Sequence, residues 1–202
     1  MERTLVRDAK GKIGEVITLK GFVQTVRNQK AVQFIILRDH TGLIQVVAER
    51  SETNSTINES ISHLTRESAI EVTGVLISNP NVKLGQFELQ LQTLSVDSMS
   101  DATLPIDLFG KTETDVDKRS DWRFLDLRQP ENQMIFRIQT TVEMAMREFW
   151  ISNGFVEIHT PKIMGSPSEG GAELFTLEYF GQTASLAQSP QFYKQMAMAA
   201  GM

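Results

Sequence analysis

Hydrophobic and polar positions in the first hundred residues follow the alternation that β-strands require. Five runs either alternate between apolar and polar residues or are rich in β-forming side chains, and they lie at residues 16–29, 31–39, 43–48, 69–77 and 86–96. Between the third and fourth runs, Ile57, Ile61 and Leu64 recur at helical spacing. Three strands, a helix and two strands in this order predict a five-stranded OB-fold barrel.

The second half of the chain changes to helical periodicity. Residues 98–130 lack a regular pattern and are acidic, which indicates a linker or hinge, and the charged run at 119–128 fits a solvated surface. Residues 131–153 carry apolar side chains at steps of three and four, so we expect a long helix that ends at Gly154. The chain is therefore predicted to be α+β.

Two shorter patterns follow the long helix. Residues 154–163 alternate like a strand up to Pro161, which cannot donate to a sheet ladder. A last helix is expected from Pro190, with Ser189 as its cap and Gly201 as its end.

Composition excludes several kinds of protein. The 202 residues contain no cysteine, so disulfides, thiolate metal ligands and cysteine nucleophiles are excluded, and three scattered histidines give no metal site. Neither a membrane-spanning run nor the apolar core of a signal peptide is present, which favours a cytoplasmic protein without membrane contact.

The net charge of −5 argues against a protein that coats nucleic acid through bulk charge. The acidity lies after residue 100, because residues 1–100 carry 11 basic and 11 acidic side chains. The neutral first part is therefore the better candidate for contact with RNA.

The last predicted helix carries polar groups close to its N-terminus. Gln191, Lys194 and Gln195 stand three and four residues apart, so an amide and an ammonium group share one face near the positive end of the helix dipole. That face suits a small carboxylate. The same spacing is also typical of a solvated helix face, and the pattern alone leaves both interpretations open.

The sequence Gln-Ser-Pro-Gln-Phe-Tyr-Lys-Gln at residues 188–195 resembles the amino-acid-binding segment of aspartyl-tRNA synthetases. Glu-Gly-Gly at 169–171 is similar to the loop that closes over their substrate. The resemblance implies that Glu169 approaches the α-amino group of L-aspartate and that Lys194 pairs with its side-chain carboxylate. Gln191 would add an orienting hydrogen bond. The charge of Lys194 would distinguish aspartate from asparagine, which has nearly the same shape.

Helix, glycine, strand and proline over residues 131–163 resemble motif 1 of class II aminoacyl-tRNA synthetases. In that family motif 1 builds the homodimer interface, which implies interface positions at Gly154, Phe155 and Pro161. Three parts follow from the resemblance: an anticodon-binding domain at 1–100, a linker at 101–130, and the front of an antiparallel-sheet catalytic domain at 131–202.

Within the predicted barrel, the strand sequences around residues 21–27, 34–39 and 42–47 resemble the anticodon-binding domain of aspartyl, asparaginyl and lysyl enzymes. The resemblance implies that Phe34 stacks on the central anticodon uridine and that Gln45 reads the same base. Arg27 would contact the RNA backbone, and Glu88 a flanking base. From periodicity alone Phe34 could equally be a core residue, because both faces of its strand are apolar.

The implied activity is that of an aspartate–tRNA ligase, which uses ATP and Mg²⁺ to form aspartyl-adenylate and then charges tRNA. We expect an inactive N-terminal portion with unassigned catalytic residues, because motifs 2 and 3 are expected downstream and only Lys194 is basic after Lys162.

One alternative is a non-catalytic tRNA-binding module or truncated paralogue, and another is a related enzyme that activates aspartate or asparagine for a different purpose. Whether asparagine tRNA is also a partner stays open, although Lys83 favours a discriminating enzyme.

Overall fold

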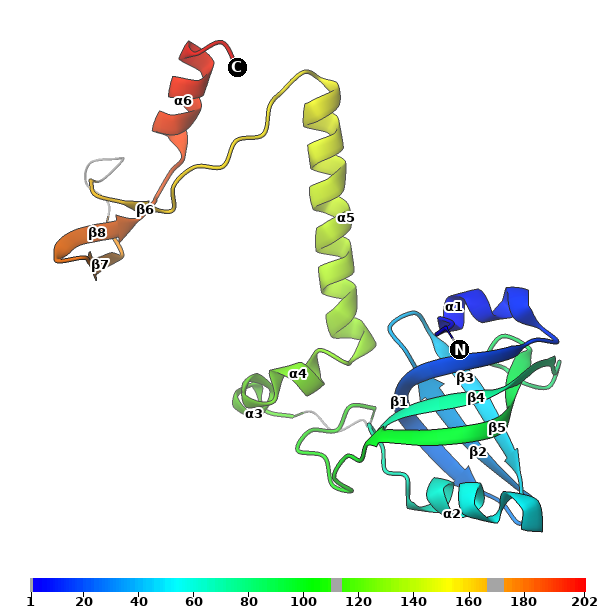
Figure 1. Ribbon diagram of the computed structural model, residues 1–202. Coiled ribbons are helices and arrows are strands. Elements are labelled where there is room, and N and C mark those ends of the chain that lie inside the picture. Colours follow the sequence, from blue (N-terminus) through cyan, green and yellow to red (C-terminus); the bar gives the residue numbers. More distant parts are fainter. Residues whose placement is uncertain (1, 110–113, 167–172) are drawn as a thin grey trace. The chain divides into compact units, whose positions relative to one another are not determined.

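The computed structural model describes residues 2–109, 114–166 and 173–202 (Figure 1). The chain divides into two compact units, Met1–Pro105 and Ile106–Met202. Part of the segment expected as a linker therefore belongs with the second unit.

The first unit is a closed barrel with strand order β1-β2-β3-β5-β4. Its strands are β1 (Val16–Asn28), β2 (Val32–Arg38), β3 (Leu43–Glu49), β4 (Ala69–Ser78) and β5 (Phe87–Ser98). Neighbouring strands are antiparallel except β3 and β5, which are parallel. The helical segments of this unit are α1 (Val6–Ala9), η1 (Lys10–Lys12), η2 (Glu52–Asn54) and α2 (Ser55–His63). The predicted OB fold and its element order are confirmed.

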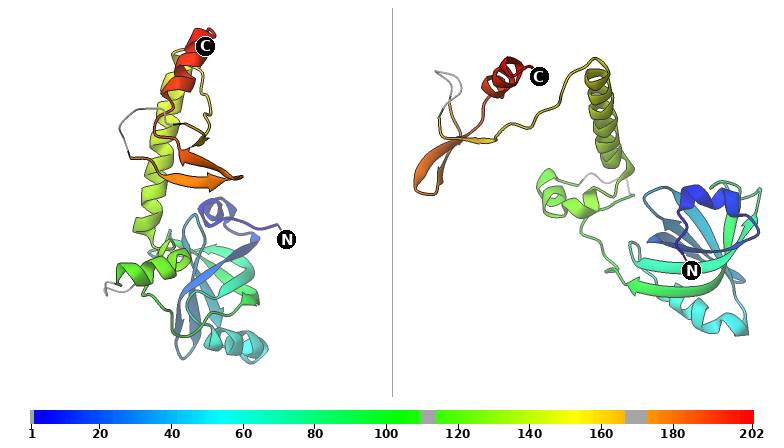
Figure 2. Two further views of the ribbon diagram at one scale, coloured as in Figure 1. Left: turned by 90° about the vertical axis from the view of Figure 1, so that its left-hand side faces the viewer. Right: turned by 45° about the horizontal axis from the view of Figure 1, so that its top comes forward.

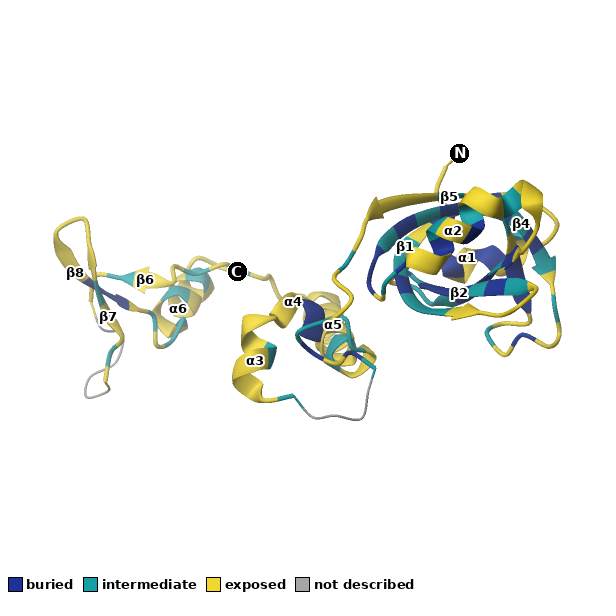
Figure 3. Cartoon of the chain, turned by 90° about the horizontal axis from the view of Figure 1, so that it is seen from below, coloured by how far each residue is buried: buried dark blue, intermediate teal, exposed yellow. Residues whose placement is uncertain are grey.

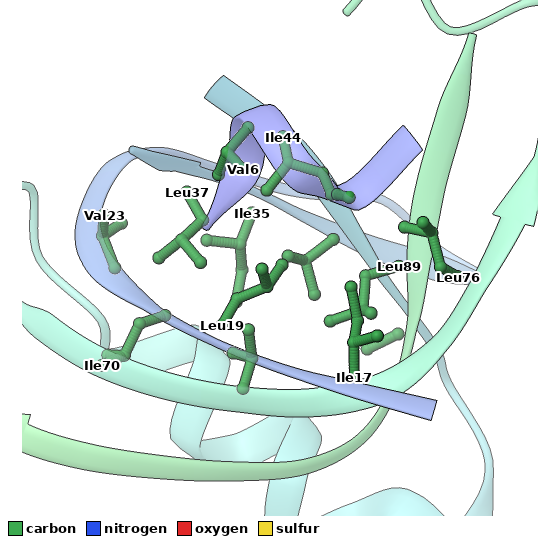
Figure 4. Packing of buried hydrophobic residues seen from close by; sticks show 14 of the residues in the cluster. Val6, Ile17, Leu19, Val23, Ile35, Leu37, Ile44, Ile70, Leu76 and Leu89 are labelled. Atoms are coloured by element: carbon green, nitrogen blue, oxygen red, sulfur yellow. The ribbon is translucent and has the colours of Figure 1, made fainter. Parts of the chain in front are cut away.

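The barrel core determines which face of β2 is buried. Gln33, Ile35 and Leu37 have almost no exposed surface. Ile35 and Leu37 belong to the hydrophobic core of the barrel together with Leu19 and Ile44 from the neighbouring strands (Figure 4). Since side chains alternate along a strand, Phe34 belongs to the outer face, where it is half-buried. Phe34 is therefore available to a ligand, a point that periodicity left open.

Two strands of the barrel approach each other closely at Gly74. A Cβ atom at this position would lie 2.0 Å from the backbone oxygen of Gln90 on β5. The register of β4 with β5 shifts between Thr73 and Gly74, so the glycine sits at a bulge that bends the barrel wall.

Replacing Gly74 by alanine is expected to lower the free energy of unfolding of the barrel by roughly 1–3 kcal/mol, the usual cost of overpacking. The backbone of β5 must move to relieve the contact, so amide hydrogen exchange in β4 and β5 should become faster. Gly11→Ala is the matched control, because an added Cβ there meets no atom within 4 Å. Equal exchange rates in the two variants would show that the strands are not in close contact.

The second unit begins with three helices, α3 (Val116–Asp121), α4 (Arg123–Asp126) and α5 (Pro130–Ser152). The helix predicted over residues 131–153 agrees with α5 to within one residue at each end, and both further views show α5 as one continuous helix (Figure 2). A three-stranded antiparallel sheet follows in the order β6-β8-β7, and α6 comes last. The bounds are β6 (Ile163–Met164), β7 (Thr176–Tyr179), β8 (Gln182–Leu186) and α6 (Gln191–Ala199).

The charged run at 119–128 is not simply solvated surface, because Asp126 is fully buried. Its carboxylate accepts a hydrogen bond from Arg119 Nε at 2.7 Å and another from Arg123, and Asn132 donates to its backbone oxygen at 2.9 Å. The hydrogen bond from Arg119 and the charges of both arginines lower the pKa of Asp126 against the opposing effect of burial. This cluster joins α4 to the first turn of α5.

The strand predicted over residues 154–163 is wrong for most of its length. Only Ile163–Met164 pairs, as β6, although the preceding residues alternate as expected. A strand needs a neighbour to accept its backbone hydrogen bonds, and within the described residues no strand pairs with 155–162, where the one backbone bond across to another segment is from Ala187 N to the oxygen of Lys162. Buried positions gather in the barrel, whereas α3, β7 and α6 are mostly exposed or half-buried (Figure 3).

Candidate nucleic-acid interface and amino-acid site

Strand register brings the four predicted anticodon residues to one region of the barrel. Arg27 on β1 lies directly opposite Phe34 on β2. Gln45 on β3 lies opposite Ile36, which is two positions along β2 from Phe34 and therefore on the same face. Glu88 on β5 is in turn the partner of Gln45. The sheet thus places these side chains in adjacent positions across four strands.

Arg27 contacts Phe34 and Gln45, the two residues that the family resemblance assigns to the central anticodon base. The carbon of its guanidinium group lies 5.5 Å from the centroid of the Phe34 ring, a cation–π distance. Its NH2 group also donates a long hydrogen bond, 3.4 Å, to Oε1 of Gln45. Arg27 is otherwise exposed, so it can exchange these contacts for contacts to a ligand.

Glu88 is held by two amides. Nε2 of Gln45 donates to Oε2 of Glu88 at 2.7 Å, and Nδ2 of Asn79 donates to Oε1 at 2.8 Å. Only 7% of the Glu88 surface is exposed, so these two hydrogen bonds satisfy a carboxylate that has little access to water. Asn79 was not among the residues predicted from the sequence, and the dipeptide Asn79-Pro80 is by itself typical only of a turn.

A ring, an amide and a guanidinium group in this arrangement suit one unpaired nucleotide. An aromatic ring on a sheet surface stacks a base, an amide next to it offers a donor and an acceptor to the base edge, and an arginine at the border meets a phosphate. OB-fold proteins bind oligonucleotides on such a face.

A groove lies beside α2 and is lined by polar residues such as Arg50, Glu52 and Glu59. No residue of this groove was predicted as a ligand-binding residue. It contains no aromatic side chain, so it offers nothing on which a base could stack.

The predicted amino-acid site lies partly within the described residues. Oγ of Ser189 accepts a hydrogen bond from the backbone N–H of Gln191 at 3.2 Å, but α6 begins at Gln191 with Pro190 as its N-cap, so the predicted cap at Ser189 and helix start at Pro190 are each wrong by one residue. Gly201, with φ of +91°, follows the helix as expected. Gln191 and Lys194 are exposed and stand one turn apart on α6. Glu169 lies outside the described residues, so the third member of the predicted set has no described position.

The motif 1 residues lie at and after the end of α5. Gly154 has φ of +81°, and its N–H donates to the oxygen of Ile151 at the end of the helix. Phe155 packs edge-on against Trp150 with ring centroids 4.9 Å apart, and Pro161 lies in the segment without strand pairing. Within the described residues α5 contains no buried residue, so its apolar side chains are exposed or half-buried.

Among the residues that the structure describes, acidic and histidine side chains nowhere gather in threes as a metal ion would need. Within the same residues, the helices are too short or too polar to cross a membrane.

Comparison with known proteins assigns both units. Residues 17–97 match the OB-fold nucleic acid binding domain, and residues 115–202 match the tRNA synthetases class II (D, K and N). The chain therefore contains an OB-fold domain followed by the start of a class II tRNA synthetase domain of the D, K and N group.

Within that group its sequence is similar to aspartate–tRNA ligases. It is 46% identical over 188 residues to the aspartate–tRNA(Asp/Asn) ligase of Methanopyrus kandleri and 44% identical over 189 residues to the aspartate–tRNA(Asp) ligase of Pyrococcus horikoshii. These matches cover 93% and 94% of this chain but only 43% of each relative. The chain thus spans less than half the length of these curated relatives.

Solved structures of the same group resemble the whole chain. The asparaginyl-tRNA synthetase of Pyrococcus horikoshii in complex with asparaginyl-adenylate matches with a TM-score of 0.87 at 28% identity, over 98% of this chain and 45% of that one. The aspartyl-tRNA synthetase of Entamoeba histolytica matches with a TM-score of 0.76 at 27% identity, over 99% of this chain and 43% of that one.

Proposed function

We propose that this chain is the anticodon-reading and aspartate-binding portion of an aspartate–tRNA ligase. The observation that supports this most is that Arg27, Phe34, Gln45 and Glu88, each assigned to the anticodon from sequence, form one connected set of contacts on the barrel. The sequence similarity to aspartate–tRNA ligases supports the choice of amino acid. A non-catalytic tRNA-binding module is less favoured, because the synthetase match continues through residues 115–202.

In this proposal Lys194 selects the substrate. Its ammonium group pairs with the side-chain carboxylate of L-aspartate, whereas the amide of asparagine leaves that charge without a counterion. Gln191, one turn earlier on α6, orients the bound amino acid, and Glu169 binds the α-ammonium group.

ATP and Mg²⁺ complete the activation chemistry of a ligase. The described residues contain no cluster of acidic or histidine side chains for a metal ion, and Lys194 is the only basic residue after Lys162. These residues therefore do not fit a site for Mg²⁺ and ATP, and we expect other residues of the enzyme to hold both.

The tRNA partner and the assembly are also part of the proposal. The chain is inferred to bind aspartate tRNA in the cytoplasm. The similar ligases include both tRNA(Asp) and tRNA(Asp/Asn) enzymes, so asparagine tRNA is a second candidate.

A second copy of the chain is expected to pack against α5 and the segment Gly154–Pro161. Apolar side chains of α5 such as Ile138 and Phe149 are more than half exposed.

A chimera tests the proposed activity. Residues 1–202 would replace the matching front portion of the Methanopyrus kandleri ligase, and ATP–pyrophosphate exchange would be measured with aspartate, asparagine and lysine. We expect exchange that depends on aspartate alone. A folded chimera that stays silent with aspartate, while the unmodified relative is active, would contradict the proposal.

A further inference from the structure

Hydrogen bonds of fixed direction connect the β4–β5 loop to the anticodon site. The backbone N–H of Asn81 donates to Oδ1 of Asn79 at 3.1 Å. A backbone N–H can only donate, so the oxygen of the Asn79 amide must face Asn81 and its nitrogen must face the other way. The loop itself is closed by the bond from Asn79 N to the oxygen of Gln86 at 2.8 Å, which holds Asn79 in place.

The direction set at Asn79 continues through Glu88 to Gln45. Nδ2 of Asn79 donates to Oε1 of Glu88, and Oε2 of Glu88 accepts from Nε2 of Gln45. A carboxylate can only accept, so the nitrogen of Gln45 must face Glu88. The oxygen of Gln45 then faces Arg27, whose guanidinium group also covers the Phe34 ring.

We propose that Asn79 is a positioning residue that acts through Glu88 to fix the amide of Gln45 with its oxygen toward the base-binding side. This inference rests on the proposed function, because it takes an RNA base to stack on Phe34. An acceptor beside the ring selects a base with an imino N–H on its pairing edge, such as uracil. Cytosine presents a ring nitrogen acceptor at that position and is disfavoured.

Arg27 also occupies the proposed base-binding position when no RNA is bound. Without RNA it donates to the Gln45 oxygen and lies over the ring, so one side chain occupies both places that a base would use. When a base arrives, its imino N–H replaces the arginine at the Gln45 oxygen, and the released guanidinium group becomes available to a phosphate.

The substitution Glu88→Gln tests the direction of these bonds. Asn79 still donates to the side-chain oxygen at position 88, so the new amide turns its nitrogen toward Gln45. Gln45 must then turn its own oxygen to that nitrogen and offer its NH2 group to the base. Binding would be measured with two aspartate anticodon stem-loops that carry uracil or cytosine as the central base.

The wild-type chain is expected to prefer the uracil stem-loop by roughly 10- to 100-fold, the discrimination typical of a base-edge contact. Glu88→Gln should reverse the preference in favour of cytosine. The double variant Asn79→Ala, Glu88→Gln lacks the donor that sets the direction, so both amide orientations are populated and the two affinities should agree within about threefold.

Two further variants complete the test. Asn79→Ala alone leaves every strand intact and should reduce the uracil preference several-fold, whereas a merely structural role would weaken both complexes equally. Asn81→Ala keeps its backbone N–H and should behave like the wild type.

The positioning role of Asn79 is overturned if Glu88→Gln and Asn79→Ala both keep the wild-type ratio of uracil to cytosine affinity. It is also overturned if the double variant still prefers cytosine. A wild-type chain that binds neither stem-loop overturns the proposed function itself, and the inference with it.

Discussion

Phe34→Ala is expected to weaken binding of the aspartate anticodon stem-loop to this chain by about 10- to 100-fold, because base–aromatic stacking contributes roughly 1–3 kcal/mol. Phe34 lies on the outer face of β2, and its ring is already in contact with a cation that a base can displace. The side chain is half-buried and outside the barrel core, so the variant should still fold. Fluorescence titration at one fixed salt concentration would give both affinities, since phosphate contacts make RNA binding sensitive to salt.

Phe180→Ala provides the matched control for this experiment. Phe180 is 90% exposed at the turn between β7 and β8, so its truncation removes an equally large ring from a different part of the chain. Its affinity for the stem-loop should equal that of the wild type. Equal losses in the two variants would show that Phe34 is not a specific platform for a base.

Lys194→Ala is expected to reduce aspartate-dependent exchange in the chimera by about 100-fold or more. In the proposed complex the bound aspartate covers Lys194, which is exposed in the free chain, and removing one partner of such a buried, hydrogen-bonded charge pair costs roughly 2–5 kcal/mol. The loss should appear mainly in the KM for aspartate, while the KM for ATP stays close to its original value, because Lys194 is assigned to the amino acid alone. Exchange rates measured over a range of aspartate concentrations separate the two constants.

The control for Lys194 is Lys162→Ala, which removes the same charge from an exposed position in the same unit. This variant should retain most of the exchange activity. If both lysines gave the same loss, the effect would reflect net charge near the site, and Lys194 would lose its assignment as the aspartate-binding residue.

The barrel could be predicted from sequence because its core obeys the two-residue period of a strand. Periodicity could not choose the buried face of β2, where Gln33 lies inside and Phe34 outside. The buried NH2 group of Gln33 donates hydrogen bonds to nearby Asn28 and also to Asn58 and Ser62 on α2, which lie 25 and 29 residues away in the sequence. Such partners are visible only after folding.

The second unit shows where local patterns fail. The alternation of 154–163 resembles a strand, but pairing depends on a neighbour that local sequence does not specify. The burial of Asp126 depends on Arg119, seven residues away, which a local charge pattern treats as solvated. For the anticodon site, resemblance gave the four residues, but only the strand register and the β4–β5 loop revealed Asn79.

NMR titration of the isotope-labelled chain with the aspartate anticodon stem-loop tests the anticodon assignment most directly. The side-chain NH2 signal of Gln45 and the backbone signals of Arg27 and Phe34 are expected to shift until one equivalent of RNA is bound. Signals of Arg50 and Glu59, in the groove beside α2, should stay in place. Shifts confined to that groove, or an unchanged spectrum at saturating RNA, would contradict the assignment of this barrel face to the anticodon.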